Sequence, residues 1–393
     1  MELEYCPYCM SPVKPGEPCE TCRLTAGSYT PAARHLPPGT VLQGRYLLGR
    51  VLGEGGFGIT YIGRDLVLGL KVAVKEYFPA DKATRDAGVS VEVSSYMGNS
   101  SSLYLRGKAN FLREAQTIAR LDRQPNIVSV KDFFETNNTA YIVMEYIDGT
   151  TFKELVEQRG GKLPAWELLH LIEPMFGALS AMHELGLIHR DISPENLMLE
   201  QGTVRLLDFG CARESANGDA TMTIMLRHGY APLEQYQGSS EGQGPWTDIY
   251  ALSATVYFCI TGKKPPQAMD RLLEDKLTPP RKLGVDLSKR QEKALLKGLS
   301  VLPRARFLSV EEFHTALYTG EAPVPVPRPE PELILRPEPE PILGPEPEPA
   351  PEPGPEPAAN RFSAWLKAHK KAVGIGATAL LALVAVGAAI AAG

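Results

Sequence analysis

Two short polar segments in the second half of the chain carry side chains that can hold a metal ion. Residues 188–197 read IHRDISPENL and place Asn196 five residues after Asp191. Residues 207–210 read LDFG, so a second carboxylate, Asp208, follows Asn196 by twelve residues. Carboxylate and amide oxygens are the ligands that Mg²⁺ prefers, and this pattern therefore predicts a magnesium site.

A glycine-rich segment in the first half of the chain is suited to phosphate binding. Residues 53–58 read GEGGFG, and glycines at this spacing let the backbone of a hairpin approach phosphate groups closely. Lys75 ends an apolar run 17 residues beyond Gly58, and Glu114 lies in a stretch of helical spacing from which it can pair with Lys75. Taken alone, the glycines are equally compatible with a plain turn, and Lys75 with the cap of a strand edge.

In this order, the glycine segment, strand lysine, helix glutamate, HRD segment and DFG segment resemble the catalytic core of bacterial Hanks-type (eukaryotic-type) serine/threonine protein kinases. The resemblance covers residues 45–318, about 70% of the chain. It implies an α+β fold of two lobes, with a β-rich N-lobe (45–144), a hinge (145–149) and an α-rich C-lobe (150–318). It also implies ATP with Mg²⁺, or optionally Mn²⁺, as cofactors and Ser or Thr hydroxyls of proteins as acceptors.

The resemblance assigns roles to single residues. It implies that Lys75 contacts the ATP phosphates, that Glu114 orients Lys75, and that Asp191 positions the substrate hydroxyl or accepts its proton. Asn196 and Asp208 would hold Mg²⁺. The residues implied around ATP are Leu52, Gly53, Glu54, Gly55, Gly56, Phe57, Gly58, Thr60, Ala73, Lys75, Glu114, Met144, Glu145 and Tyr146.

Two positions depart from the family pattern. Ser193 stands where these kinases usually carry a lysine, and Arg227 stands where they usually carry a threonine. Loss of a cation beside the transferred phosphate should slow the reaction, because electrostatic stabilisation is usually the largest catalytic contribution. We hypothesise that Arg227 lies on the loop facing Ser193 and supplies the missing charge from the other side as a catalytic residue. The alternatives are that Arg227 is a surface or substrate contact, and that the chain is a pseudokinase scaffold with weak phosphate transfer.

Other residues of the C-lobe are expected to support or regulate the site. The resemblance implies an ion pair between Glu234 and Arg306, and it implies that Asp248 braces the catalytic loop. Thr221 and Thr223 lie in a polar segment after Asp208 and are candidate autophosphorylation sites, because Arg190 could pair with a phosphate there. The other interpretation of this segment is a plain exposed loop.

The elements that must position these residues follow from hydrophobic periodicity. Alternation of apolar and polar residues predicts strands over residues 46–51, 59–62 and 71–75, whereas apolar residues at 111, 115, 118 and 121 predict a helix. Helical spacing dominates from residue 166, as in 168–183 and 291–299. The stretch from 76 to 108 is longer than the family minimum, and the sequence leaves open whether it is functional or partly disordered.

Four cysteines near the N-terminus form a second candidate metal site. Cys6, Cys9, Cys19 and Cys22 are two CxxC pairs nine residues apart, a set suited to tetrahedral Zn²⁺. The sequence therefore predicts a zinc-ribbon knuckle over residues 1–25, followed by a linker over 26–44; two disulfides are the alternative. The knuckle carries more acids than bases, and the globular body is nearly neutral, so no nucleic-acid binding is expected.

The C-terminal part of the chain differs in composition from the rest. Residues 321–357 hold 15 of the 34 prolines and nine acids, which predicts a disordered Pro/Glu linker. Residues 358–371 form a basic collar, and residues 372–393 contain no charged side chain. At about 1.5 Å per residue these 22 residues span a bilayer core, so one transmembrane helix is expected, with a buried soluble helix as the alternative.

The positive collar predicts a single-pass protein of the cell membrane whose kinase domain is cytoplasmic. Small residues spaced four apart in the apolar tail are compatible with a homodimer.

Overall fold

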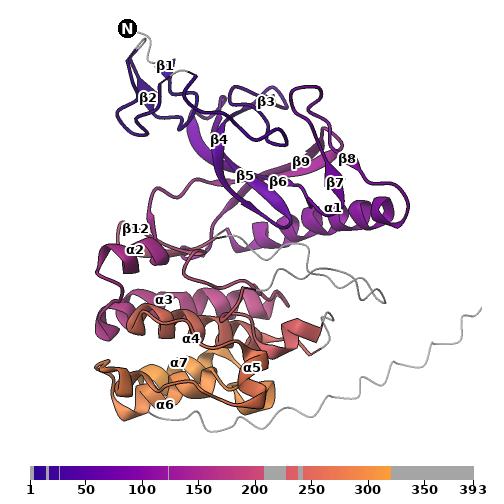
Figure 1. Cartoon of the computed structure of the whole chain (residues 1–393). Coiled ribbons are helices and arrows are strands. Elements are labelled where there is room, and N and C mark those ends of the chain that lie inside the picture. The colour runs from indigo at the N-terminus through magenta and orange to yellow at the C-terminus, as the bar shows by residue number, and fades with distance from the viewer. Residues whose placement is uncertain are drawn as a thin grey trace, which may run out of the picture. The chain divides into compact units, whose positions relative to one another are not determined.

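Six strands of the first lobe form one antiparallel sheet (Figure 1), in the order β3-β4-β5-β6-β10-β9. The computed structural model describes residues 4–14, 17–25, 27–122, 124–207, 227–237 and 242–319. The six strands are β3 (Val41–Leu42), β4 (Tyr46–Gly55), β5 (Gly58–Asp65), β6 (Leu70–Tyr77), β9 (Val130–Thr136) and β10 (Thr139–Glu145). The three strands predicted from alternation are confirmed; β4 extends beyond its predicted C-terminal end, and β5 and β6 extend beyond both predicted ends.

The β4–β5 hairpin carries the glycine-rich segment at its turn, directly above β6. A Cβ atom built at Gly58 would collide with the backbone carbonyl of Glu76 on β6, whereas Cβ atoms at Gly53 and Gly55 would meet nothing within 4 Å. Gly58 is therefore required by the close packing of two backbones, and the two glycines at the tip leave open space.

One long helix packs beneath the sheet, α1 (Asn99–Ile118), continued by the 3₁₀ turn η1 (Ala119–Leu121). The helix begins before residue 111, where the apolar pattern placed its start. The pattern missed the first turns because they carry polar serines, which give no apolar signal. Gly98 precedes the helix with a φ of 76°, and Tyr104, Phe111 and Ala115 bury the face toward the sheet.

The long stretch after β6 is ordered, contrary to one of the two options that the sequence left open. It contains the short hairpin β7 (Ala83–Thr84) and β8 (Ser94–Ser95). Arg85 inserts into the lobe and forms an ion pair with Glu76, both side chains being fully buried. The hydroxyls of Tyr61 and Tyr141 donate hydrogen bonds to the same carboxylate at 3.0 and 2.7 Å.

The second lobe is helical, as periodicity predicted. Helices α2 and α6 begin with capping boxes at Thr151 and Ser288, and α4 is buried along nearly its whole length. A small three-stranded sheet beside the lobe junction has the strand order β11-β12-β13. These elements are α2 (Phe152–Gln158), α3 (Ala165–Glu184), α4 (Pro245–Thr261), α5 (Ala268–Leu273), α6 (Lys289–Gly298), α7 (Val310–Tyr318), β11 (Thr150–Thr151), β12 (Leu197–Glu200) and β13 (Thr203–Leu206), with 3₁₀ turns η2 (Leu233–Gln237), η3 (Pro280–Leu283) and η4 (Pro303–Ala305).

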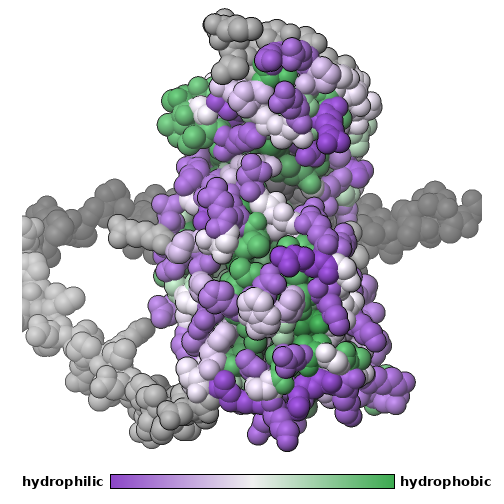
Figure 2. All heavy atoms as spheres, turned by 90° about the vertical axis from the view of Figure 1, so that its left-hand side faces the viewer, coloured by the Kyte–Doolittle hydropathy of each residue, from purple (hydrophilic) through white to green (hydrophobic). Residues whose placement is uncertain are grey.

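One hydrophobic core runs through both lobes, and a second, small core lies in the N-terminal knuckle around its cysteines. The knuckle contains the hairpin β1 (Glu4–Tyr5) and β2 (Pro12–Val13). Figure 2 shows hydrophilic residues over most of one face of the protein, with apolar residues gathered in smaller patches between them.

Among the helices in the described ranges, none is long and apolar enough to cross a lipid bilayer. The three C-terminal segments predicted over 321–357, 358–371 and 372–393 lie outside the described residues.

Candidate active site and metal centre

A cavity of about 870 Å³ is lined by the glycine-rich turn, β6, the hinge and the catalytic loop. Of the residues predicted around ATP, every one except Glu114 lines this cavity. Lys75 reaches it from β6, and Asp191 and Arg227 line its C-lobe side. Glu114 lies half-buried in α1, and its predicted pairing with Lys75 stays a prediction.

Several cavity residues were missed by sequence reasoning. Three are apolar: Val128, Met198 and Leu207, whereas Ile147 belongs to the hinge that the resemblance implied. Met198 could have been found from strand alternation, because Leu197 on β12 is buried and its neighbour must face the other way. The polar residues that were missed are Arg50, Thr151, Glu154 and Glu195, together with Gly149.

The side chain of Glu145, at the start of the hinge, is bound by two neighbouring residues. It forms an ion pair with Arg205 on β13 and accepts a hydrogen bond from the Ser129 backbone N–H at 2.9 Å. The Glu145 N–H donates to the carbonyl of Ser129 at 3.0 Å. Glu145 thus lines the cavity while its carboxylate is engaged by the protein itself.

Both oxygens of the Asp191 carboxylate are held in place. Arg227 Nε lies 2.9 Å from Oδ1, and Asn196 Nδ2 donates to Oδ2 at 3.0 Å and to the Asp191 carbonyl at 2.7 Å. With its amide nitrogen committed in this way, Asn196 presents its oxygen, which accepts only a long bond of 3.3 Å from Arg227 among the described residues. Asn196 thus offers one hard oxygen ligand beside Asp191, which fits a magnesium site.

The catalytic loop is braced from below by Asp248, as expected. This fully buried carboxylate accepts hydrogen bonds from the backbone N–H groups of His189 and Arg190 at 2.9 and 2.8 Å, and it contacts His183 Nε2 at 2.8 Å. Burial by itself would raise the pKa of Asp248, but the hydrogen bond and charge of His183, with the backbone donors, lower it below its ordinary value. Asp248 therefore stays ionised and fixes the loop.

Arg227 bridges two acids of the catalytic loop. Besides Asp191, its guanidinium lies 3.4 Å from Glu195. Ser193 is completely buried, and within the described part of the chain its hydroxyl has no hydrogen-bond partner. Ser193 does not line the cavity, whereas Arg227 lies beside the Asp191 carboxylate, and the hypothesis that Arg227 supplies a catalytic charge stays a prediction.

The predicted ion pair between Glu234 and Arg306 is confirmed. Arg306 Nη1 and Nη2 lie 2.7 and 3.1 Å from the two oxygens of Glu234, and both side chains are buried. Asp208, Thr221 and Thr223 lie outside the described residues.

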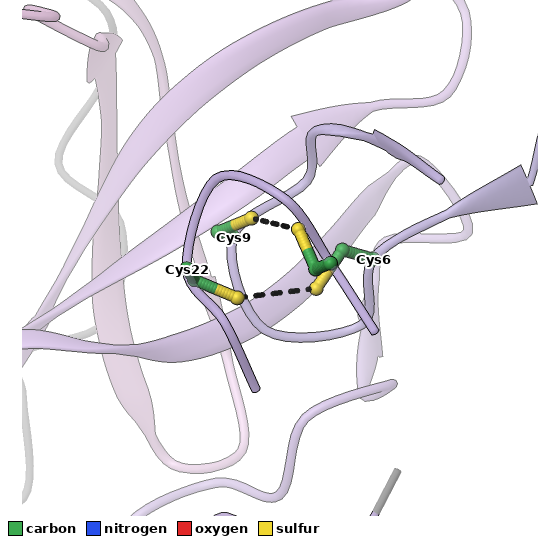
Figure 3. Close-up of side chains that lie close together, drawn as sticks. Cys6, Cys9 and Cys22 are labelled. Carbon is green, nitrogen blue, oxygen red and sulfur yellow. Dashed lines mark hydrogen bonds between the residues drawn. The ribbon is translucent and has the colours of Figure 1, made fainter. Parts of the chain in front are cut away.

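The four N-terminal cysteines converge on one point, and Figure 3 labels three of them, Cys6, Cys9 and Cys22. Their sulfur atoms all lie within 4.8 Å of one another, with 3.6 Å between Cys6 and Cys22 and 3.5 Å between Cys9 and Cys19. A disulfide requires about 2.05 Å, so the disulfide alternative is wrong. Four sulfurs at about 2.3 Å from a tetrahedral zinc ion lie about 3.8 Å apart, which fits the observed spacing.

The protein environment favours a thiolate at Cys19 alone of the three cysteines whose pKa is shifted, because burial raises the pKa of Cys6 and raises that of Cys22 to about 12. Burial opposes ionisation of Cys19, but backbone N–H groups of Cys22 and Thr21 and the thiol of Cys9 outweigh it and lower the pKa of Cys19 to about 6. A metal ligand must be deprotonated, so Cys19 is already suited to a thiophilic cation, whereas such a cation would have to displace the protons of Cys6 and Cys22.

Comparison with known proteins places this geometry in a family. Residues 46–293 match the family model described as "Protein kinase domain". Serine/threonine-protein kinase PknB of Mycobacterium tuberculosis is 34% identical over 301 residues, covering 72% of this chain and 44% of that protein. PknB of Mycobacterium leprae is 32% identical over 303 residues with the same shares, so the chain matches less than half the length of these curated relatives.

Solved structures agree. The structure titled "PpkA-294 apo form" has a TM-score of 0.63 and 33% identity, covering 72% of this chain and 99% of its own. The PknI kinase domain of Mycobacterium tuberculosis has a TM-score of 0.52 and 26% identity, covering 72% of this chain and 98% of its own. With its lobes, cavity and catalytic loop in the expected places, the chain belongs to the protein kinase family.

Proposed function

We propose that the protein transfers the γ-phosphate of ATP to Ser or Thr hydroxyls of other proteins. The observation that carries this proposal is the Asp191 carboxylate, held on both oxygens at the wall of a cavity that also contains Lys75 and the glycine-rich turn. The curated relatives named above are serine/threonine kinases, which supports the choice of acceptor.

The chemistry requires position and charge. Asp191 lies where it can accept the proton of an attacking hydroxyl, and its fixed orientation reduces the entropy lost when that hydroxyl binds. Lys75 would contact the phosphates from β6, and the apolar side chains of Val128, Met198 and Leu207 would enclose the adenine. Asn196, together with Asp208, would hold the magnesium ion, which neutralises phosphate charge when bound.

Arg227 would supply the cation that Ser193 lacks. Its guanidinium spans Asp191 and Glu195 and reaches the Asn196 amide oxygen, so one positive charge serves three groups of the catalytic loop. A guanidinium keeps its charge at all physiological pH values and binds oxygen acceptors in a fixed geometry. These contacts support a catalytic role for Arg227 in place of a lysine at position 193.

Autophosphorylation at Thr221 or Thr223 is part of the proposal. Arg190 has a φ of 66°, and its Nε is buried without a hydrogen-bond partner among the described residues. A buried guanidinium N–H without an acceptor is suited to donate a hydrogen bond to a phosphate oxygen. We expect phosphopeptide mapping after incubation with Mg-ATP to find phosphate between residues 211 and 228, and a clean segment would contradict this part.

The N-terminal knuckle is proposed to bind one structural Zn²⁺ through Cys6, Cys9, Cys19 and Cys22. Its small core consists largely of these cysteines, so the ion would replace the apolar packing that a segment of this size lacks.

We further propose that residues 372–393 anchor the protein in the cell membrane as one helix. Their uncharged composition and the basic collar before them support this orientation, with the kinase domain on the cytoplasmic side.

A phosphotransfer assay tests the central proposal. The full chain, kept in detergent because of its apolar C-terminus, is incubated with labelled Mg-ATP and a general acceptor protein, and labelled residues are identified after acid hydrolysis. We expect phosphoserine or phosphothreonine with the wild type and with Asp286→Ala, an exposed carboxylate far from the cavity in sequence, but none with Asp191→Ala. Label that survives in Asp191→Ala, or only on tyrosine, would refute it.

A further inference from the structure

The segment between the cysteine knuckle and the first lobe is bound to the lobe along its length. We call residues 29–39 the strap. The hydroxyl of Tyr29 accepts a hydrogen bond from the Val51 N–H at 3.2 Å, and the Leu36 N–H donates to the hydroxyl of Tyr61 at 3.1 Å. The side chain of Leu36 is buried in the core of the lobe. The strap is therefore fixed on β4 and β5, the two strands that carry the glycine-rich turn.

Two residues in the middle of the strap bind Glu54, the one acidic side chain of the glycine-rich turn. Arg34 Nε and Nη2 donate to the two oxygens of Glu54 at 2.6 and 3.1 Å, and His35 Nε2 lies 3.0 Å from Glu54 Oε2. A two-point contact between a guanidinium and a carboxylate fixes orientation as well as distance. The Glu54 side chain is 25% exposed, and these partners lower its pKa against the effect of its burial.

The strap also reaches the strand that carries Lys75. The carbonyl of Arg34 accepts hydrogen bonds from Arg85 Nε at 2.9 Å and Nη2 at 2.5 Å. Arg85 in turn forms the buried ion pair with Glu76, the residue that follows Lys75 on β6. Arg34 thus joins two walls of the cavity, one through its side chain and the other through its backbone.

The turn is held by its pairing with β5, in which Glu54 lies opposite Ile59, but the two glycines beside Glu54 have no packing contact on the side where a Cβ would stand. Gly53 and Gly55 flank Glu54, and neither has an atom within 4 Å of the place where a Cβ would stand. Glycine loses more conformational freedom on ordering than any other residue, so a turn of this composition gains most from an external anchor. Glu54 is the residue by which such an anchor is attached here.

We propose that Arg34 and His35 are positioning residues that hold the glycine-rich turn in its nucleotide-binding conformation through Glu54. The inference rests on the proposed ATP site. Loss of the anchor should make the turn more mobile, so that nucleotide binding must order it and the affinity falls. Because Arg34 and His35 form no hydrogen bond or ion pair with Asp191 or with the described residues bonded to it, the rate of the chemical step should change little.

The test measures the dissociation constant of Mg-ATP together with KM and kcat on the full chain. Because the Arg34 side chain is 49% exposed, we expect Arg34→Ala to raise the dissociation constant and KM about two- to fivefold, with kcat within about twofold of the wild type. Glu54→Gln should have a similar effect, and the double variant should be no worse than the more severe single variant, because both changes break one contact. Arg34→Lys should fall between, since it keeps the charge and loses the two-point geometry.

The matched control is Arg45→Ala. Arg45 makes an equivalent two-point contact with Asp65 on the same sheet, and it does not line the cavity. This variant should leave the affinity for Mg-ATP unchanged. Hydrogen exchange of residues 53–58 should quicken in Arg34→Ala and not in Arg45→Ala.

Two results would overturn the proposal. One is an Arg34→Ala protein that binds Mg-ATP as tightly as Arg45→Ala does. The other is recovery of affinity in the double variant, because Glu54 would then act by repelling phosphate and not by anchoring the turn. A wild-type protein that binds no nucleotide would instead refute the proposed function, and this inference with it.

Discussion

Replacing Arg227 with alanine should separate nucleotide binding from phosphate transfer. The change removes the 2.9 Å contact with Asp191 Oδ1 and leaves that carboxylate held by Asn196 alone. It also leaves Glu195 and Asp191 in one loop without the cation between them. The transferring phosphate would then approach Asp191 without this cation, and Glu195 with only Lys153, 3.6 Å from its Oε1, as an ion-pair partner among the described residues.

The magnitude follows from burial. Removing one preorganised charge-stabilising donor from an enclosed site costs about 10²–10³ in kcat. The Arg227 side chain is 36% exposed and Asp191 is 19% exposed, so water screens part of the interaction. We therefore expect kcat to fall about 10- to 100-fold, below the full range for an enclosed donor.

Single-turnover transfer at saturating Mg-ATP is the suitable assay, with the dissociation constant of Mg-ATP measured separately. Arg159→Ala is the control, because it removes an arginine that pairs with Glu167 on the surface of the same lobe. Ser193→Lys should restore part of the rate in Arg227→Ala, because a lysine can extend its charged end out of a buried position. An unchanged or faster transfer rate in Arg227→Ala would refute a catalytic role for this residue.

Two further changes test the frame around the site. Arg306→Met should lower the free energy of unfolding by about 3–5 kcal/mol in urea denaturation, because it leaves the Glu234 carboxylate buried without its cation. A loss of unfolding free energy no larger than that caused by Arg159→Ala would contradict this prediction. Native mass spectrometry should find one zinc ion per chain, which is retained in Cys259→Ser and lost in the Cys9→Ser/Cys19→Ser variant. Once the zinc is lost, trypsin or chymotrypsin should cut within residues 4–25. Zinc that survives in the double serine variant would exclude the proposed site.

Sequence reasoning succeeded where chemistry is carried by a short motif. The residues around Asp191 are bound to one another within five positions, so their mutual placement is decided locally by the loop and by the donors aimed at Asp248. The strands β4 to β6 were predictable for a similar reason, since each pairs with its neighbour in the chain and buries alternate residues.

Contacts of backbone atoms were beyond prediction. The knuckle docks where the carbonyl of Tyr8 accepts a hydrogen bond from the Arg50 N–H at 3.0 Å, and a Cβ at Gly49 would come within 2.7 Å of that same carbonyl. Neither atom has a side-chain signature, so a glycine in the middle of a strand gave the only hint. The start of α1 escaped for a related reason, because polar residues open the helix and its apolar face appears only from Tyr104.

The origin of the catalytic charge has a consequence for control. A lysine at position 193 would belong to the catalytic loop, which Asp248 fixes from below. Arg227 instead follows the segment that contains Thr221 and Thr223, and its contacts with Asp191 join that segment to the reactive carboxylate. If Arg227 supplies the charge, any modification that shifts this segment also shifts a group bonded to Asp191. Phosphorylation there should then change kcat directly, whereas in Ser193→Lys/Arg227→Ala the same phosphate should change kcat much less, because the charge no longer depends on the segment.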